Sequence, residues 1–141
     1  MNAPKWTEEA LHWLKFAMED LRQAEILVKS EQAPPRHACW FAQQATEKAL
    51  KAALILEGIS FPFRHNLNAL RDLLPAGWRV KDQYPDLSEL TVWAVEACYP
   101  GDWPEATRED ADRAVRDARG VLESVVEGFR SRGVAVHGLG G

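Results

Sequence analysis

The 141-residue sequence has only two cysteines and no run of the roughly 20 apolar residues that a membrane-spanning helix requires. A disulfide framework and a membrane-embedded protein are therefore not expected. Cys39 and Cys98 both fall in apolar helical patterns and are predicted to pack as small apolar side chains. The first residues lack a basic segment followed by an apolar one, so we expect a cytoplasmic protein without a secretion signal.

Several signatures of catalysis and ligand binding are also missing. The sequence has no glycine-rich phosphate loop and no Gly-x-Ser-x-Gly turn. His37 and Cys39 lack the second pair of ligands that a zinc site requires, and side chains two positions apart on a helix point away from each other. The sequence therefore predicts neither a metal nor a cofactor, and no Cys-His catalytic pair.

No segment alternates apolar and polar residues as a strand does, whereas apolar residues recur every three or four positions over most of the chain. This spacing predicts an all-α fold, an up-and-down helical bundle of four main helices plus one short helix. We expect one domain over residues 1–131, which is a usual domain size. Residues 132–141 are rich in glycine, have no periodicity, and are predicted to form a flexible tail.

The ends of the expected helices are indicated by capping residues and prolines. Thr7, Asn66 and Thr107 are predicted N-caps. Asp110 stands three residues after Thr107 and completes a capping box. The second helix carries an alanine-rich stripe, and because small side chains allow close approach, this helix is predicted to lie at the centre of the bundle. The main helices are expected over about 7–30, 35–57, 86–97 and 107–129, and the short one over about 66–74.

The net charge of −4 conceals an uneven distribution. Residues 34–81 carry seven basic and three acidic side chains, whereas residues 82–106 carry six acidic side chains and no lysine or arginine. One interpretation is a solvated surface with two patches of opposite sign. The other is a phosphate-facing patch that binds a nucleotide or RNA. Its members would be Arg36, His37, Lys48, Lys51, Arg64 and His65.

Two positions of this patch stand just before the expected short helix. Arg64 and His65 could hold a phosphate together with the free amides of a helix start. His65 could equally be a capping or packing histidine. If the patch binds a ligand, replacing Lys48 and Lys51 by glutamate should weaken binding with little change in the melting temperature.

The sequence contains more large aromatic side chains than the core of a small bundle needs. The sequence has six tryptophans in addition to the alanine-rich stripe. Tryptophans in a small helical domain usually anchor a core or an interface. A homodimer formed through helices is therefore predicted.

Three features occur together in a defined order along the chain. They are the run Phe41 to Ala52 that reads FAQQATEKALKA, His65 followed by Leu67 and Leu70, and the segment Tyr99-Pro100-Gly101-Asp102. Together they resemble the HEPN family (higher eukaryotes and prokaryotes nucleotide-binding), over roughly residues 7–130. The resemblance implies an up-and-down helical bundle that commonly dimerises. It also implies a nucleotide- or RNA-binding module acting with a minimal nucleotidyltransferase partner, of toxin-antitoxin type.

Many HEPN domains resemble metal-independent RNases that use an arginine and a histidine separated by four to six residues. The last helix of this chain contains Arg113, Arg116 and Arg119 but no histidine. Arg132 and His137, in the predicted tail, have the required spacing, and Arg130 and His137 have it as well. The first interpretation is therefore a binding module without RNA cleavage. One alternative is an RNase toxin that uses His65 or the Arg132 and His137 pair, and another is a helical scaffold that docks a basic partner on its acidic stretch.

Overall fold

The structure is a computed structural model that describes residues 5–62, 66–94 and 105–138. Within these residues every regular element is a helix, which confirms the all-α prediction, and none is long and apolar enough to cross a bilayer. Three helices are long and three are short. In chain order they are α1 (Thr7–Val28), α2 (Pro35–Leu56), α3 (Leu67–Asp72), α4 (Val80–Gln83), α5 (Ser88–Thr91) and α6 (Arg108–Ser131).

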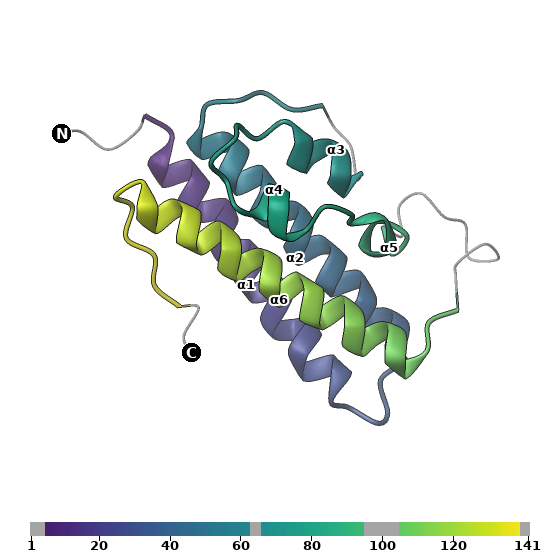
Figure 1. The fold of residues 1–141 in the computed structure, drawn as a ribbon. Helices are drawn as coiled ribbons and strands as arrows, with labels where there is room; N and C mark the ends of the chain where they lie inside the picture. The colour runs from purple at the N-terminus through teal and green to yellow at the C-terminus, as the bar shows by residue number, and fades with distance from the viewer. Residues whose placement is uncertain (1–4, 63–65, 95–104, 139–141) are drawn as a thin grey trace.

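The three long helices form the body of the molecule (Figure 1). α1 and α2 are antiparallel neighbours joined by a short loop, and α6 packs against α2 and runs in the same direction as α2. Because α2 and α6 are parallel, the chain between them has to return along the bundle. The short helices α3, α4 and α5 lie on this return path, which we call the return segment.

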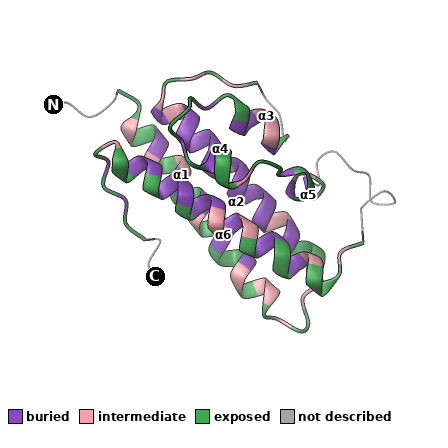
Figure 2. Ribbon diagram, viewed as in Figure 1, coloured by how far each residue is buried: buried purple, intermediate pink, exposed green. Residues whose placement is uncertain are grey.

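The central position predicted for α2 is confirmed. Figure 2 shows buried residues along most of this helix, whereas α1 and α6 each keep an exposed side. Ala42, Ala45 and Ala49 have no exposed surface. Their small side chains allow the neighbouring helices to pack closely on more than one side of α2.

The helix starts agree largely with the capping residues of the sequence. The hydroxyl of Thr107 accepts a hydrogen bond from the N–H of Asp110 at 3.0 Å, and the Asp110 carboxylate accepts from the N–H of Thr107 at 3.0 Å. Asn66 caps α3 as predicted. The prediction for α1 is wrong by one position, because Trp6 is its N-cap and Thr7 is its first helical residue.

A fourth long helix is expected over residues 86–97, but in the described part of this range, residues 86–94, only α5 is an α-helix. α5 ends at Thr91, and residues 95–104 lie outside the described chain. The Thr91 hydroxyl donates to the Leu87 carbonyl at 3.1 Å and accepts from the N–H of Leu67 at 3.2 Å. Threonine side chains bonded to the backbone, and β-branched side chains in general, weaken a helix. α4 is an additional turn that the sequence pattern did not predict.

Two aromatic side chains of the return segment pack against glycines of α6. A Cβ atom at Gly128 would lie 2.4 Å from the ring of Trp78, and one at Gly120 would lie 1.6 Å from the hydroxyl of Tyr84. Any larger residue at either glycine would collide with the ring. The two glycines therefore allow the return segment to dock closely on α6.

The chain after α6 turns back beside the bundle (Figure 1). Val134 and Val136 are buried in the hydrophobic core, and Arg130 Nη2 donates to the Val136 carbonyl at 2.9 Å. Alternate residues of an extended segment face the same side, which explains why these two valines are buried together. The sequence predicts a flexible tail from residue 132 and does not predict these contacts.

Cys39 lies in the core, as predicted, with a free thiol. Burial is the main cause that raises the pKa of this thiol to about 12, and the negative charge of Asp110 adds to it. Such a thiol is protonated and unreactive at neutral pH. Cys98 lies outside the described residues.

Candidate functional site

The polar residues of the FAQQATEKALKA run form a buried chain of hydrogen bonds on α2. Gln44 Nε2 donates to Gln43 Oε1 at 2.7 Å, and Gln43 Nε2 donates to Glu47 Oε1 at 3.0 Å. Lys51 Nζ donates to Glu47 Oε2 at 2.9 Å. The four side chains stand one turn apart or adjacent on the same helix, so the sequence spacing itself sets this geometry.

Lys51 is enclosed rather than presented to solvent. Its side chain is only 6% exposed, and that of Glu47 is 7% exposed. The Lys51 ammonium lies 5.8 Å from the ring centre of Trp13 and 5.6 Å from that of Phe61. A cation over aromatic faces and beside a carboxylate is stabilised in place. Lys51 therefore joins α1, α2 and the segment after α2.

Lys48 also has a carboxylate partner. Its Nζ lies 2.5 Å from Asp20 Oδ2, across the interface between α2 and α1. The ammonium groups of both lysines of the predicted phosphate patch are thus occupied by acidic side chains of the same chain. The positive charges of these two lysines are therefore compensated within the chain.

The two other members of the predicted patch that the structure describes, Arg36 and His37, lie away from these lysines. Arg36 is exposed in the first turn of α2, 15 positions before Lys51, which corresponds to about 22 Å along the helix. His37 is exposed beside Arg36. Arg64 and His65 lie outside the described residues. The structure brings Lys48 and Lys51 together on one helix and separates them from Arg36.

The Arg132 side chain is held by several contacts, one of them with Glu57 at the end of α2. Its Nε donates to Glu57 Oε1 at 2.9 Å, and its Nη1 donates to the Gly128 carbonyl at 3.0 Å. Its guanidinium carbon lies 4.0 Å from the ring centre of Trp78. These contacts fix the guanidinium as a structural link between α6, α2 and the return segment.

His137 faces a different part of the molecule. It is exposed and lines a groove together with α1 residues such as Lys15 and Met18. Among the described residues, no hydrogen bond or ring contact joins His137 to Arg132. The spacing of these two residues in the sequence therefore does not produce a paired arginine and histidine in this chain.

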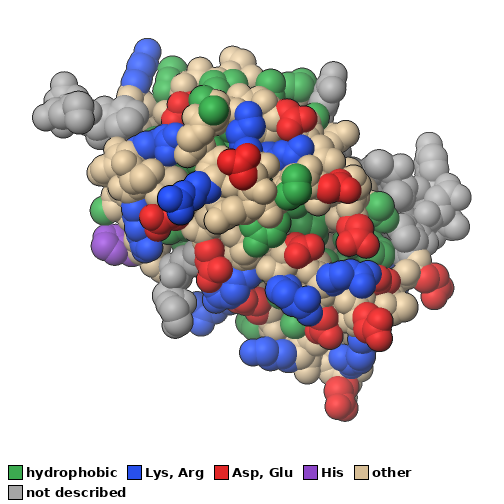
Figure 3. Space-filling view, in the orientation of Figure 1, with side chains coloured by type: hydrophobic (Ala, Val, Ile, Leu, Met, Phe, Trp, Pro, Cys, Tyr) green, Lys and Arg blue, Asp and Glu red, His purple; other side chains and the backbone are tan. Residues whose placement is uncertain are grey.

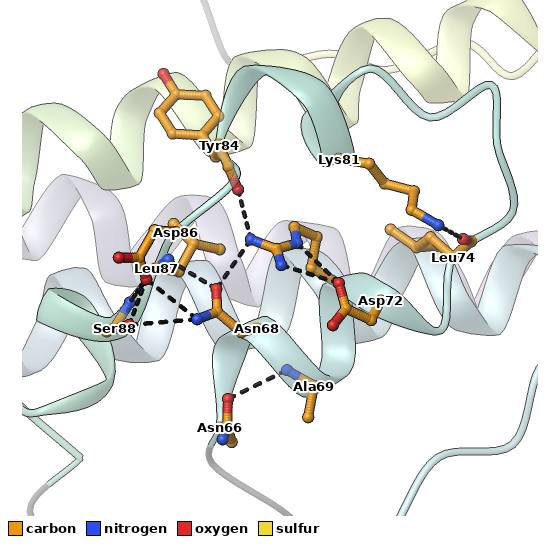
Figure 4. A network of polar contacts seen from close by, with 11 residues as sticks. Asn66, Asn68, Ala69, Asp72, Leu74, Lys81, Tyr84, Asp86, Leu87 and Ser88 are labelled. Carbon is orange, nitrogen blue, oxygen red and sulfur yellow. Dashed lines mark hydrogen bonds and ion pairs between the residues drawn. The ribbon is translucent and has the colours of Figure 1, made fainter.

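The return segment is held by a polar network around Asn68 (Figure 4). The Asn68 side-chain oxygen accepts from the N–H of Leu87 at 2.7 Å and from Arg71 Nη1 at 2.9 Å. Arg71 Nη1 also donates to the Tyr84 carbonyl at 2.7 Å. The side-chain nitrogen of Asn68 donates to Asp86 at 3.2 Å. One asparagine therefore fastens α3 to the start of α5.

Asp86 is the acidic member of this network. Hydrogen bonds from the hydroxyl and the N–H of Ser88 and from the Asn68 side chain lower the pKa of Asp86 from its ordinary 3.8 to about 2. The carboxylate is therefore ionised over the whole physiological range and acts as a structural acceptor.

A small pocket between α5 and α6 carries acidic side chains. Arg113 Nη2 lies 2.8 Å from Asp110 Oδ1, and Arg113 Nε lies 3.7 Å from Glu89 Oε2. Asp117 also lines the pocket, and burial followed by repulsion from Glu89 raises its pKa. Only Glu89 of these three acidic residues belongs to the acidic stretch 82–106 found in the sequence, whereas Asp110 and Asp117 come from α6. No group of three metal-ligating side chains lies close enough together in the described ranges to hold an ion.

The surface over α6 and the return segment has no extended region of one charge. Figure 3 shows Lys and Arg side chains interspersed with Asp and Glu over this face. A phosphate backbone is attracted by a contiguous positive surface. This face therefore offers no strong attraction to nucleic acid.

An antiparallel α1 and α2, a parallel α6 and a buried Gln-Glu-Lys chain on the central helix define a class of small all-helical domains. The family model of the HEPN domain matches residues 10–129 of this chain. The match covers most of the sequence, and the protein belongs to the HEPN family. The resemblance seen in the sequence is thereby confirmed.

Relatives and solved structures agree with this assignment. The chain is 29% identical over 136 residues to a Methanocaldococcus jannaschii protein described as "Putative toxin MJ1304", covering 85% of this chain and 88% of that protein. The crystal structure of TT1696 from Thermus thermophilus is similar with a TM-score of 0.71 and 28% identity, over 84% of this chain and 97% of that one. ST0689, described as an archaeal HEPN homologue, shares the fold with a TM-score of 0.56 and 24% identity, over 87% and 97% of the two chains.

Proposed function

We propose that this HEPN protein is the toxin-like member of a two-protein toxin-antitoxin pair, and that it acts by binding rather than by cutting RNA. The observation that carries this proposal is the similarity, over 85% of the chain, to a relative described as a putative toxin. Because that similarity covers 88% of the relative as well, it concerns the whole domain and not a shared fragment.

The absence of cleavage in this proposal follows from the surroundings of Arg132. Its guanidinium is bonded to Glu57 and stacked on Trp78, and His137 lines a separate groove. Proton transfer to or from RNA requires a histidine held within hydrogen-bond reach of the reacting oxygen. Arg132 is held by structural contacts, and His137 has no hydrogen bond to any residue that the structure describes. The two residues therefore do not supply this arrangement.

Ligand binding in this proposal rests on Arg64 and His65, with Arg36 as a separate cation. Lys48 and Lys51 are not counted as ligand contacts, since both are paired with carboxylates of the same chain. Phe61, whose ring lies near Lys51, shortly precedes Arg64 in the sequence. A nucleotide phosphate or an RNA backbone is the expected ligand.

The proposal also includes a homodimer and a nucleotidyltransferase partner. α1 exposes Phe16, which is 44% accessible and whose ring lies 5.4 Å from that of His12. On α2, the partly exposed rings of Trp40 and Phe41 form an edge-to-face pair with centres 4.9 Å apart. Exposed aromatic side chains of this kind are typical anchors of protein interfaces.

The test is controlled expression in a bacterial host, alone and together with a nucleotidyltransferase encoded beside this gene. We expect growth arrest by the protein alone, relief by the partner, and co-purification of the two proteins. The double variant Arg64→Ala and His65→Ala should abolish arrest without loss of soluble protein, whereas Arg79→Ala, an exposed cation of the return segment, should not. Normal growth with abundant folded protein would contradict the proposal.

A further inference from the structure

A groove runs along the side of α1 that faces the chain after α6. Its volume is about 780 Å³. Leu11, Met18 and Leu21 of α1 and Val136 of the returning chain give it an apolar floor. Gly138 marks one wall, where an added Cβ atom would lie 3.6 Å from the sulfur of Met18.

A row of cations borders this groove. Lys15 and Arg22 line it, and Lys29 continues the row, each seven residues after the previous one. All three are exposed, and none forms an ion pair with any residue in the described part of the chain. Residues seven positions apart lie on the same side of a helix, so the three charges point in one direction.

The acidic side chains of the groove do not compensate this row. Glu25 is paired with Arg119, with 2.8 Å between the carboxylate and the guanidinium. Glu19 lies on α1 between Lys15 and Arg22. In the groove lining, one carboxylate without an ion-pair partner in the described chain therefore stands against two such cations, and Lys29 lies beyond the lining.

The apolar residues have the same period as the cations. Leu11 and Met18 are seven residues apart and line the groove, while Leu14 and Leu21, also seven apart, are buried in the core. An apolar seam flanked by charges at a seven-residue period is the pattern by which one helix recognises another. One side of α1 thus combines the partly exposed apolar residues Leu11 and Met18 with exposed cations, and these are the features of a helix-binding surface.

We propose that this groove binds an amphipathic helix of a protein partner, with an apolar stripe on the floor and acidic residues opposite Lys15, Arg22 and Lys29. The floor from Leu11 to Glu25 is about 21 Å long, which matches four turns of helix. Nucleic acid would satisfy the cations but leave the apolar floor uncovered. A symmetric second copy would place the same cations against each other. This inference is independent of the proposed function.

The probe is a fluorescently labelled amphipathic peptide of about 15 residues with leucine at the seam positions and glutamate flanking them. Its controls are a scrambled peptide of the same composition and a peptide with lysine in place of glutamate. Fluorescence anisotropy against the full-length protein should give micromolar binding for the first peptide only. Amide NMR shifts caused by that peptide should fall on residues 11–29 and 133–138.

The charge row is tested by the double variant Lys15→Glu and Arg22→Glu, which should weaken peptide binding by about tenfold or more. The matched control, Arg79→Glu with Arg116→Glu, changes the net charge equally on exposed residues outside the groove and should leave binding within about twofold. Circular dichroism checks that both variants remain folded. Absence of binding, equal weakening in the control, shifts on another face, or displacement of the peptide by a short oligoribonucleotide would overturn the proposal.

Discussion

Lys51 and Glu47 form an ion pair of 2.9 Å in which both side chains are almost fully buried. The sequence count treats Lys51 as a surface cation available to phosphate, whereas the fold uses it to hold Trp13, Phe61 and Glu47 together. A buried charge whose partner is removed is strongly destabilising. The FAQQATEKALKA run of α2 is therefore first of all a structural element, and the proposed ligand binding has to use other cations.

Lys51→Ala is expected to lower the free energy of unfolding by about 3 kcal/mol, because the buried Glu47 carboxylate would lose its ion pair with the Lys51 ammonium. Lys48→Ala is the control, since its pair with Asp20 is more accessible and should cost about 1 kcal/mol or less. Urea unfolding measures both. Equal and small losses would contradict the account. The sequence-based expectation that glutamate at both positions changes the melting temperature only a little is replaced by an expected loss of stability.

Gly128→Ala is expected to destabilise the protein by about 2 to 3 kcal/mol, because Trp78 is fully buried and cannot move away from the added methyl group. Gly120→Ala should cost less, since Tyr84 is only half-buried and its hydroxyl end can shift. Thermal unfolding compares the two variants. Stabilisation of both, as helix propensity alone would give, would show that the rings do not pack as described.

Asp86 predicts a defined pH dependence. Its pKa of about 2 in the folded protein lies below the ordinary 3.8, so its contribution to stability is complete above about pH 4 and is lost as the pH falls toward 2. Asp86→Ala should therefore lower the melting temperature at pH 6 and approach the parent protein near pH 2. Asp82→Ala, an exposed carboxylate of α4, is the matched control. A difference between parent and Asp86→Ala that does not change with pH would rule out this role.

Phe16→Glu is expected to convert the proposed homodimer into a folded monomer, because a charge would be placed in an aromatic interface. Val92→Glu is the control, as Val92 is 49% exposed but lies at the end of α5. Light scattering coupled to size-exclusion chromatography gives the mass of each. A dimer that survives Phe16→Glu, or a parent protein that is monomeric, would remove this face from the proposal.

Much of the fold can be predicted from local sequence signals. The alanine stripe places α2 at the centre, and the Thr107 and Asp110 capping box defines the start of α6. Both signals are contained within a few residues. The return segment was predicted less well, since its single turns depend on tertiary bonds such as that from the Leu67 N–H to the Thr91 hydroxyl.

The candidate site was harder to predict than the fold, because charge counts do not show which charges are paired. Asp20 lies 28 positions before its partner Lys48, and Glu57 lies 75 positions before Arg132. Only the packed structure brings these groups together. The seven-residue row of Lys15, Arg22 and Lys29, in contrast, can be read from the sequence alone, because it depends only on the period of a helix.

The most direct test of the central claim is incubation of the protein with end-labelled single-stranded and structured RNA in the presence of EDTA. The parent protein is assayed beside His65→Ala, Arg132→Ala and His137→Ala. The account predicts that the parent protein binds RNA or nucleotide without cutting RNA, and that His65→Ala weakens binding whereas His137→Ala does not. Metal-independent cleavage by the parent protein that disappears in any of these variants would contradict the account and identify an RNase.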